Sequence, residues 1–237
     1  MIPLVGSRLA MFGGRAGSRQ DSARSGSIRR LNFVVAAVAI VLALPLMVLI
    51  ALAVAATSRG PILYRQRRVG QDRRGSRRPL KENGRRSFDA GGRIFTMYKF
   101  RTMYHGDPGD PAHETWARRD DPRVTPLGAL LRKHRLDELP QLFNVLRGDM
   151  NVVGPRPEQP GLFKELDGQV EGYRQRQAVL PGITGWAQVN HAYDQSLDDV
   201  RRKVELDLEY IRRRSPLEDL RIMVRTLPVM VARRGSL

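Results

Sequence analysis

The chain of 237 residues contains no cysteine, which excludes a disulfide framework and a thiolate zinc site. Histidine is also rare, and the four histidines lack the spacing of a zinc-binding pair. Only five of the 41 basic residues are lysine, so arginine carries most of the positive charge. Acidic residues number 24, which leaves a formal net charge of +17. Such an excess favours a polyanionic partner: nucleic acid, anionic lipid headgroups or a phosphorylated substrate.

One long apolar run covers residues 31–56, and its strongly polar residue is Asn32, near its start. About 20 apolar residues suffice to cross a bilayer, so the run predicts a membrane element. The alternative is a cleaved secretory signal, because residues 53–55 (AVA) resemble a cleavage site. The run is longer than the apolar part of a signal peptide, however, and the arginines that follow it would resist export.

Two arrangements of this element are open: a helix that spans the bilayer, and a re-entrant helix that enters, breaks and returns. Pro45 lies in mid-run and removes a backbone donor, which predicts a kink in either case. Arginines lie on both sides of the run, and positive charge prefers the cytoplasmic side. The charge pattern therefore favours the re-entrant helix. Residues 1–30, rich in Gly, Ser and Arg, predict a disordered basic tail resting on anionic lipid.

Residues 57–237 predict one small domain of the α+β class, mostly helical. Extended segments are expected at residues 61–70 and 93–103, with polar loops at residues 71–92 and 104–122. Apolar spacing predicts helices near residues 127–131, over 138–147 with Asp137 as N-cap and Gly148 as the end, over 200–213 and over 217–232. The last helix is basic and amphipathic, which fits either a membrane interface or ordinary core packing.

The segment of residues 132–157 combines an acidic pair with arginines and a Gly-Pro-Arg-Pro turn. As a helix N-cap, Asp137 would lie where backbone N–H groups and the helix dipole favour a phosphoryl group. An aspartate can attack phosphorus, and phosphoryl transfer needs cations around the transferred oxygens. The expected cations are Arg132, Arg156, Lys99 and Arg101. Plain helix capping by Asp137 and Glu138 is the alternative interpretation of the pair.

Several motifs follow one another in a fixed order along the chain. They are the apolar run with its central proline, and residues 64–70 (YRQRRVG), 98–103 (YKFRTM), 136–142 (LDELPQL), 147–150 (RGDM), 153–157 (VGPRP) and 181–190 (PGITGWAQVN). In this order they resemble the bacterial sugar transferase family. These are monotopic phosphoglycosyl transferases, which begin glycoconjugate or exopolysaccharide assembly on polyprenyl phosphate.

The resemblance implies a two-step exchange at the cytoplasmic face of the bacterial inner membrane, anchored by a re-entrant helix. Asp137 would attack the β-phosphate of a UDP-sugar and release UMP, and the phosphosugar would then pass from Asp137 to undecaprenyl phosphate. Glu138 would assist with proton handling or geometry. Mg²⁺ would bind at Asp137, and Arg132 and Arg156 would hold phosphate groups.

Three departures from the family pattern are visible. Leu44 precedes Pro45 where relatives often have serine, and the basic stretch of residues 71–92 is longer than expected. After Asn190 the chain reads HAYD, closer to relatives that transfer hexose phosphates, which favours glucose or galactose donors. Two other classes stay open. A non-catalytic basic membrane protein is disfavoured as a nucleic-acid binder because residues 65–86 lack interleaved aromatics. An inactive scaffold is disfavoured by the intact acidic pair and Arg156. A homodimer is an open alternative.

Overall fold

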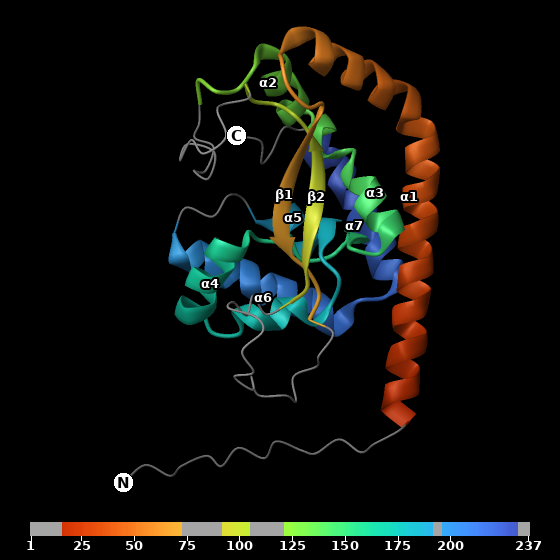
Figure 1. Cartoon of the computed structure of the whole chain (residues 1–237). Coiled ribbons are helices and arrows are strands. Elements are labelled where there is room, and N and C mark those ends of the chain that lie inside the picture. Colours follow the sequence, from red (N-terminus) through yellow and green to blue (C-terminus); the bar gives the residue numbers. More distant parts are fainter. Residues whose placement is uncertain (1–15, 73–91, 105–120, 192–195, 232–237) are drawn as a thin grey trace, which may run out of the picture.

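The computed structural model describes residues 16–72, 92–104, 121–191 and 196–231 (Figure 1). The long helix α1 (Ala16–Thr57) runs along one side of the remaining elements, past α3 and α7, and its last part bends over α2 (Figure 1). Pro45 lies inside α1, which continues through it. The expected kink is thus a bend in an unbroken helix. By length and composition, α1 could cross a membrane.

The helix α1 begins 15 residues before the apolar run, so the prediction of a disordered tail over residues 1–30 is wrong for residues 16–30. Residues 1–15 lie outside the described residues. The basic part of α1 is ordered because the domain offers acceptors for its side chains. Arg29 donates to the carbonyl oxygens of Val145 and of Met150, the latter at 2.9 Å. Asn32 is fully buried.

A β-hairpin carries one side of the functional site. Strands β1 (Leu63–Val69) and β2 (Ile94–Phe100) pair antiparallel, with Tyr64 opposite Lys99, which confirms both expected extended segments. The outer edge of β2 is covered by α3, not by another strand. There Asn144 donates to the carbonyl of Thr96 at 2.7 Å and accepts from the N–H of Tyr98 at 3.1 Å.

Two short helices and a tight turn follow the hairpin. Helix α2 (Pro126–Lys133) lies where apolar spacing predicted a helix, and its N-cap is Thr125, whose hydroxyl accepts from the N–H of Gly128. The expected helix over 138–147 is wrong in its first part: a 3₁₀ turn, η2 (Leu136–Glu138), precedes the shorter α3 (Gln141–Arg147). Arg135 precedes η2 with a left-handed φ of 54°, and Pro140 has no N–H to continue the turn. Gly148 ends α3 as expected.

The remaining elements complete the domain, with α4 and α6 in the lower part of Figure 1 and α7 beside α3. They are β3 (Asn151–Val153), α4 (Pro160–Gln169), η3 (Tyr173–Ala178), β4 (Gly182–Thr184), α5 (Trp186–Asn190), α6 (Leu197–Arg213) and α7 (Pro216–Val231). Strands β3 and β4 pair in parallel. The sequence did not predict α4, and it predicted a loop where β4 lies. Helices α6 and α7 are close to their expected bounds.

Apolar faces of α1 and α7 remain uncovered. In α7, Ile222 is buried in the core, whereas Leu217, Val224 and Leu227 are each more than 60% exposed. In α1, Val41 and Leu42 are more than 70% exposed. The amphipathic pattern of α7 therefore serves core packing on one side and leaves an apolar surface on the other.

Candidate active site

The acidic pair lies in η2, between α2 and α3, and faces the hairpin. Asp137 and Glu138 are 7% and 6% exposed. Asp137 is not the N-cap of an α-helix, because the position before η2 is Arg135 and α3 begins only at Gln141. The helix-capping interpretation therefore does not account for the pair. Two adjacent carboxylates that are nearly buried need cations close by, because an unpaired buried charge is costly.

Glu138 is held by two cations from different elements. Its Oε1 accepts from Lys99 Nζ of β2 at 2.7 Å and from Arg156 Nη2 at 2.8 Å. Burial alone would raise the pKa of Glu138, but the charges of Arg156 and Lys99 hold that pKa well below its usual value. Glu138 is therefore a carboxylate at neutral pH, and it fixes two cationic side chains beside its neighbour.

Asp137 is in a different electrostatic situation. Lys99 Nζ lies 3.8 Å from Asp137 Oδ2, outside hydrogen-bonding distance. Burial raises the pKa of Asp137; the charge of Lys99 offsets part of the shift, and the charge of Glu138 adds to it. A carboxylate that is desolvated and only loosely paired is a better nucleophile, and a better ligand for an added cation, than one locked in a salt bridge.

Of the predicted cations, the structure brings three to the acidic pair. Arg132 is fixed by a 2.8 Å hydrogen bond from its Nε to Thr102 Oγ1, and its charge lowers the pKa of Asp137. Lys99 and Arg156 contact Glu138 directly. The prediction for Arg101 is wrong: its guanidinium binds the carbonyl oxygens of Ser58 and Pro61, at 2.6 and 2.7 Å. Arg101 thus holds the C-terminal end of α1.

The sequence analysis missed two buried residues behind Arg156. Arg68 Nη1 lies 3.9 Å from Glu158 Oε2, and it donates to the carbonyl of Pro157 at 2.9 Å. Burial lowers the pKa of Arg68 to about 10, although the charge of Glu158 partly opposes this. The signal was present, since Arg68 and Tyr64 are an even number of residues apart in one strand and so share the face of Lys99.

Within the described residues, no three acidic, histidine or cysteine side chains converge as a metal site would require. Asp137 nevertheless fits a magnesium ion of the kind that takes one or two carboxylates from the protein and the rest of its ligands from substrate phosphates. Its raised pKa reflects a desolvated carboxylate that an added cation would stabilise.

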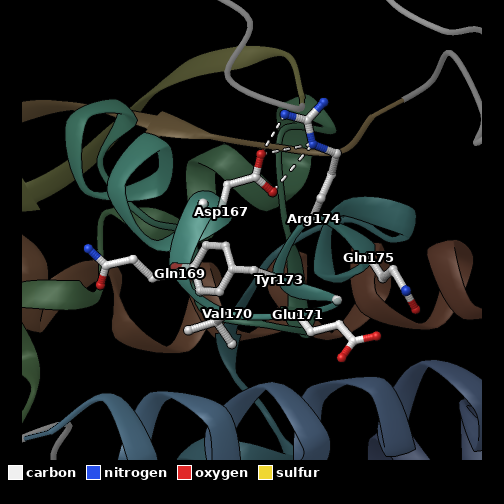
Figure 2. A pocket seen from close by; sticks show the side chains of 9 residues that line it. Asp167, Gln169, Val170, Glu171, Tyr173, Arg174 and Gln175 are labelled. Carbon is white, nitrogen blue, oxygen red and sulfur yellow. Dashed lines mark hydrogen bonds and ion pairs between the residues drawn. The ribbon is translucent and has the colours of Figure 1, made fainter.

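A separate hollow of about 450 Å³ lies beside the turn between α4 and η3. It is lined by the consecutive residues 167–175, and Figure 2 shows Asp167 and Arg174 paired at its rim. None of the residues named above for the acidic pair lines it.

The sequence that carries this site matches that of known proteins. The family model described as bacterial sugar transferase matches residues 24–233, which include most of α1, the acidic pair and Arg156. The chain belongs to the bacterial sugar transferase family. This confirms the resemblance that the motifs indicated.

Curated members of the bacterial sugar transferase family are 34–42% identical to this chain. The UDP-N-acetylgalactosamine-undecaprenyl-phosphate N-acetylgalactosaminephosphotransferase of Aeromonas hydrophila is 38% identical over 88% of this chain and 44% of its own length. The UDP-glucose:undecaprenyl-phosphate glucose-1-phosphate transferase of Xanthomonas campestris pv. campestris is 40% identical over 86% and 40%. A protein with the same name from Caulobacter vibrioides is 37% identical over 86% and 69%.

The chain spans less than half the length of the first of these bacterial sugar transferases. The names of the relatives include both an N-acetylated sugar and glucose at nearly the same identity. Overall similarity therefore does not identify the donor sugar. The preference for glucose or galactose donors stays a prediction.

Proposed function

We propose that this chain transfers a sugar-1-phosphate from a UDP-sugar to undecaprenyl phosphate, through a phosphosugar bound to Asp137. The observation that carries the proposal is the contrast within the acidic pair. Glu138 is paired by Lys99 and Arg156, whereas Asp137 is buried beside the same cations without being locked to either. This leaves Asp137 available to attack an electrophile that the cations would attract.

In the first step, a carboxylate oxygen of Asp137 attacks the β-phosphorus of the donor, and the bond from that phosphorus to the bridging oxygen breaks. UMP leaves with the bridging oxygen and its electron pair. Lys99, Arg132 and Arg156 lie where they can neutralise charge on the phosphoryl oxygens. Mg²⁺ bound at Asp137 and the donor phosphates would supply further neutralisation of this kind.

In the second step, a phosphate oxygen of undecaprenyl phosphate attacks the same phosphorus and the bond to Asp137 breaks. Asp137 is regenerated as a carboxylate, and the product is undecaprenyl-diphosphate-sugar. Throughout, Glu138 keeps Lys99 and Arg156 beside the reacting group because both bind its Oε1. Dividing one transfer between two attacks is the advantage of a covalent intermediate.

The test is UMP release by the detergent-solubilised protein with undecaprenyl phosphate, Mg²⁺ and a panel of UDP-sugars. UDP-glucose, UDP-galactose and UDP-N-acetylhexosamines are compared, each beside Asp137→Asn. We expect release with one class of donor, and none from the variant although it still reaches the membrane. Full activity of Asp137→Asn would contradict the assignment of Asp137 as the nucleophile. Absence of UMP release by the folded wild type with every donor would contradict the proposed reaction.

We further propose that α1 is re-entrant through its bend (Figure 1) and without a break in the helix, with the catalytic domain on the cytoplasmic face of the bacterial membrane. A straight span of the 26 apolar residues would separate its ends by about 39 Å. Yet the domain contacts α1 near both ends of the run: Arg29 reaches Met150, and Arg101 reaches Ser58. The exposed apolar faces of α1 and α7 would then enter the lipid of the same leaflet.

The topology can be tested by thiol labelling without background, because the chain has no cysteine. Single cysteines at Ser27 and Arg59, both exposed, should react with an impermeant reagent from the cytoplasmic side alone. A cysteine at Leu42 is the control: it is exposed in the protein but should be shielded by lipid. Labelling of residues 27 and 59 from opposite sides would demonstrate a spanning helix.

A further inference from the structure

The turn that carries Arg156 is held by its carbonyl groups. Four consecutive carbonyl oxygens, from Pro155 to Glu158, each accept a hydrogen bond from outside the turn. The donors are, in order, Gly182 N at 2.9 Å, Arg176 Nη2 at 3.1 Å, Arg68 Nη1 at 2.9 Å and Val69 N at 2.9 Å. Two of the four residues are prolines, which have no N–H. The carbonyls are therefore the main points at which this turn can be fixed.

The donor to Arg156 itself is a buried guanidinium with a rigid support. The side chain of Arg176 is 3% exposed, and its Nε donates to Asp207 Oδ2 of α6 at 2.7 Å. Its guanidinium also lies over the ring of Tyr173, 4.9 Å from the centroid. While its Nε is bound to Asp207, its Nη2 donates to the carbonyl of Arg156 at 3.1 Å.

A second buried carboxylate joins this support to β1. Glu158 Oε1 lies 3.8 Å from Arg176 Nη1 and 3.0 Å from Lys203 Nζ. The same carboxylate lies 3.9 Å from Arg68, so both guanidinium donors to the turn share it. Replacing a whole network of this kind by apolar side chains of similar shape is often neutral, because desolvation offsets the attraction, whereas removing one partner leaves a buried charge unpaired. The guanidinium of Arg176 donates a directional hydrogen bond to the turn, which an apolar side chain could not do.

We propose that Arg176, supported by Asp207, is a positioning residue that sets the guanidinium of Arg156 against the acidic pair by holding its main-chain carbonyl. This inference rests on the proposed function, in which Arg156 acts at the reacting phosphate. Arg156 Nη2 lies 2.8 Å from Glu138 Oε1. A rotation of the peptide between Arg156 and Pro157 would swing the side chain away from that oxygen.

The first experiment compares Arg176→Lys with Arg174→Lys in UMP release. Lysine keeps the charge at position 176 but cannot bind Asp207 and the carbonyl of Arg156 with one planar fork. Arg174 is the matched control, because it lies in the same η3 turn and binds Asp167 at the surface (Figure 2). We expect the turnover of Arg176→Lys to fall at least about tenfold with KM for the donor nearly unchanged, since small misplacements of a catalytic group cost this much.

A double-mutant cycle separates positioning from a general loss of structure. If Arg176 acts through Arg156, then Arg176→Lys should lower turnover by less than about twofold in an Arg156→Ala background. Labelled donor and high enzyme concentration keep the slow background measurable. Losses that add in the double variant would overturn the proposal, because a structural role would lower turnover whatever stands at position 156.

Folding of the variants is checked by their thermal midpoints. If Arg176→Lys does not fold, the paired variant Arg176→Met with Asp207→Leu replaces it, since removing both charges leaves neither buried and unpaired. That variant should also fold and show lowered turnover. If the wild type is active and the folded variant at position 176 has the same turnover, this inference is overturned and the proposed function is not. An inactive wild type would overturn the proposed function on which it rests.

Discussion

Asn32 donates a 2.7 Å hydrogen bond to Asp219 Oδ2, 187 positions later in the chain. Its side-chain oxygen accepts from the N–H groups of Val152 and Val153, at 2.8 and 3.1 Å. Tyr210 donates to the other carboxylate oxygen of Asp219 at 2.8 Å. One buried amide, from the sole strongly polar residue of the apolar run, therefore joins α1 to β3 and α7.

We predict that Asn32→Leu lowers the thermal midpoint of the solubilised protein. The substitution leaves a buried carboxylate and two buried N–H groups without their partner, which should cost about 2–4 kcal/mol. The control is Phe33→Leu, at the neighbouring position, which is 46% exposed. Equal midpoints for the two variants would show that the α1 contact does not depend on Asn32.

Lys99→Met should lower UMP release about a hundredfold, as loss of one preorganised donor at a charged transition state does. Lys99 Nζ lies close to both carboxylates, at 2.7 Å from Glu138 Oε1 and 3.8 Å from Asp137 Oδ2. Lys133→Met, at an exposed position of α2, is the control. The rate is measured at saturating donor and acceptor, and near-wild-type turnover of Lys99→Met would remove Lys99 from the mechanism.

Because of Glu158, the free energy of unfolding should fall as the pH is lowered in the acid range. Burial alone would raise its pKa, but the charges of Lys203, Arg176 and Arg68 lower that pKa from 4.5 to about 2. The contribution is present in full above pH 4.5 and is lost as the pH falls towards 2; it amounts to about 3 kcal/mol. The difference between the midpoints of wild type and Glu158→Gln should therefore be constant above pH 4.5 and shrink as the pH falls from 4.5 to 3.

The control for this titration is Glu205→Gln, whose exposed carboxylate pairs with Arg202 on α6. We expect its midpoint to follow that of the wild type at every pH. A wild-type advantage over Glu158→Gln that stayed constant down to pH 3 would contradict the lowered pKa.

Two glycines should respond in opposite directions to the same substitution. A Cβ on Gly128 would lie 2.0 Å from the carbonyl oxygen of Thr102, so Gly128→Ala must push α2 away from the end of β2. We expect a lower midpoint and slower transfer, because Thr102 also holds Arg132. Gly161→Ala in α4 meets open space and should stabilise by about 0.5–1 kcal/mol. A neutral Gly128→Ala would contradict this packing.

Sequence reasoning identified elements whose signal is local. Thr125 and Pro126 start α2, Gly148 ends α3, and alternation identifies β2, all as the structure has them. The predictions were wrong where contacts between residues far apart in the sequence determine the local conformation. By sequence, residues 16–30 resemble a polar tail, but in the structure they are helical and Arg29 binds carbonyl groups of the domain. Asp137 looks like a helix cap until the left-handed Arg135 and Pro140 impose a 3₁₀ turn.

The site was predicted in the same uneven way. The motifs indicated Asp137, Glu138, Lys99, Arg132 and Arg156, and the structure gathers them around one pair of carboxylates. Arg101 has the same charge and lies two residues after Lys99, but the free carbonyls at the end of α1 bind it instead. Charge and spacing do not reveal which acceptor an arginine will meet.

The cover that Asn144 gives β2 bears on how copies of this chain could associate. The open edge of a strand is the usual place where another chain adds a strand of its own. Here one amide mimics that missing neighbour, accepting from Tyr98 and donating to Thr96. Domain swapping or intermolecular sheet growth at β2 would first have to displace α3 and, with it, the acidic pair. The covered edge of β2 is therefore not available to a second copy of this chain while α3 stays in place.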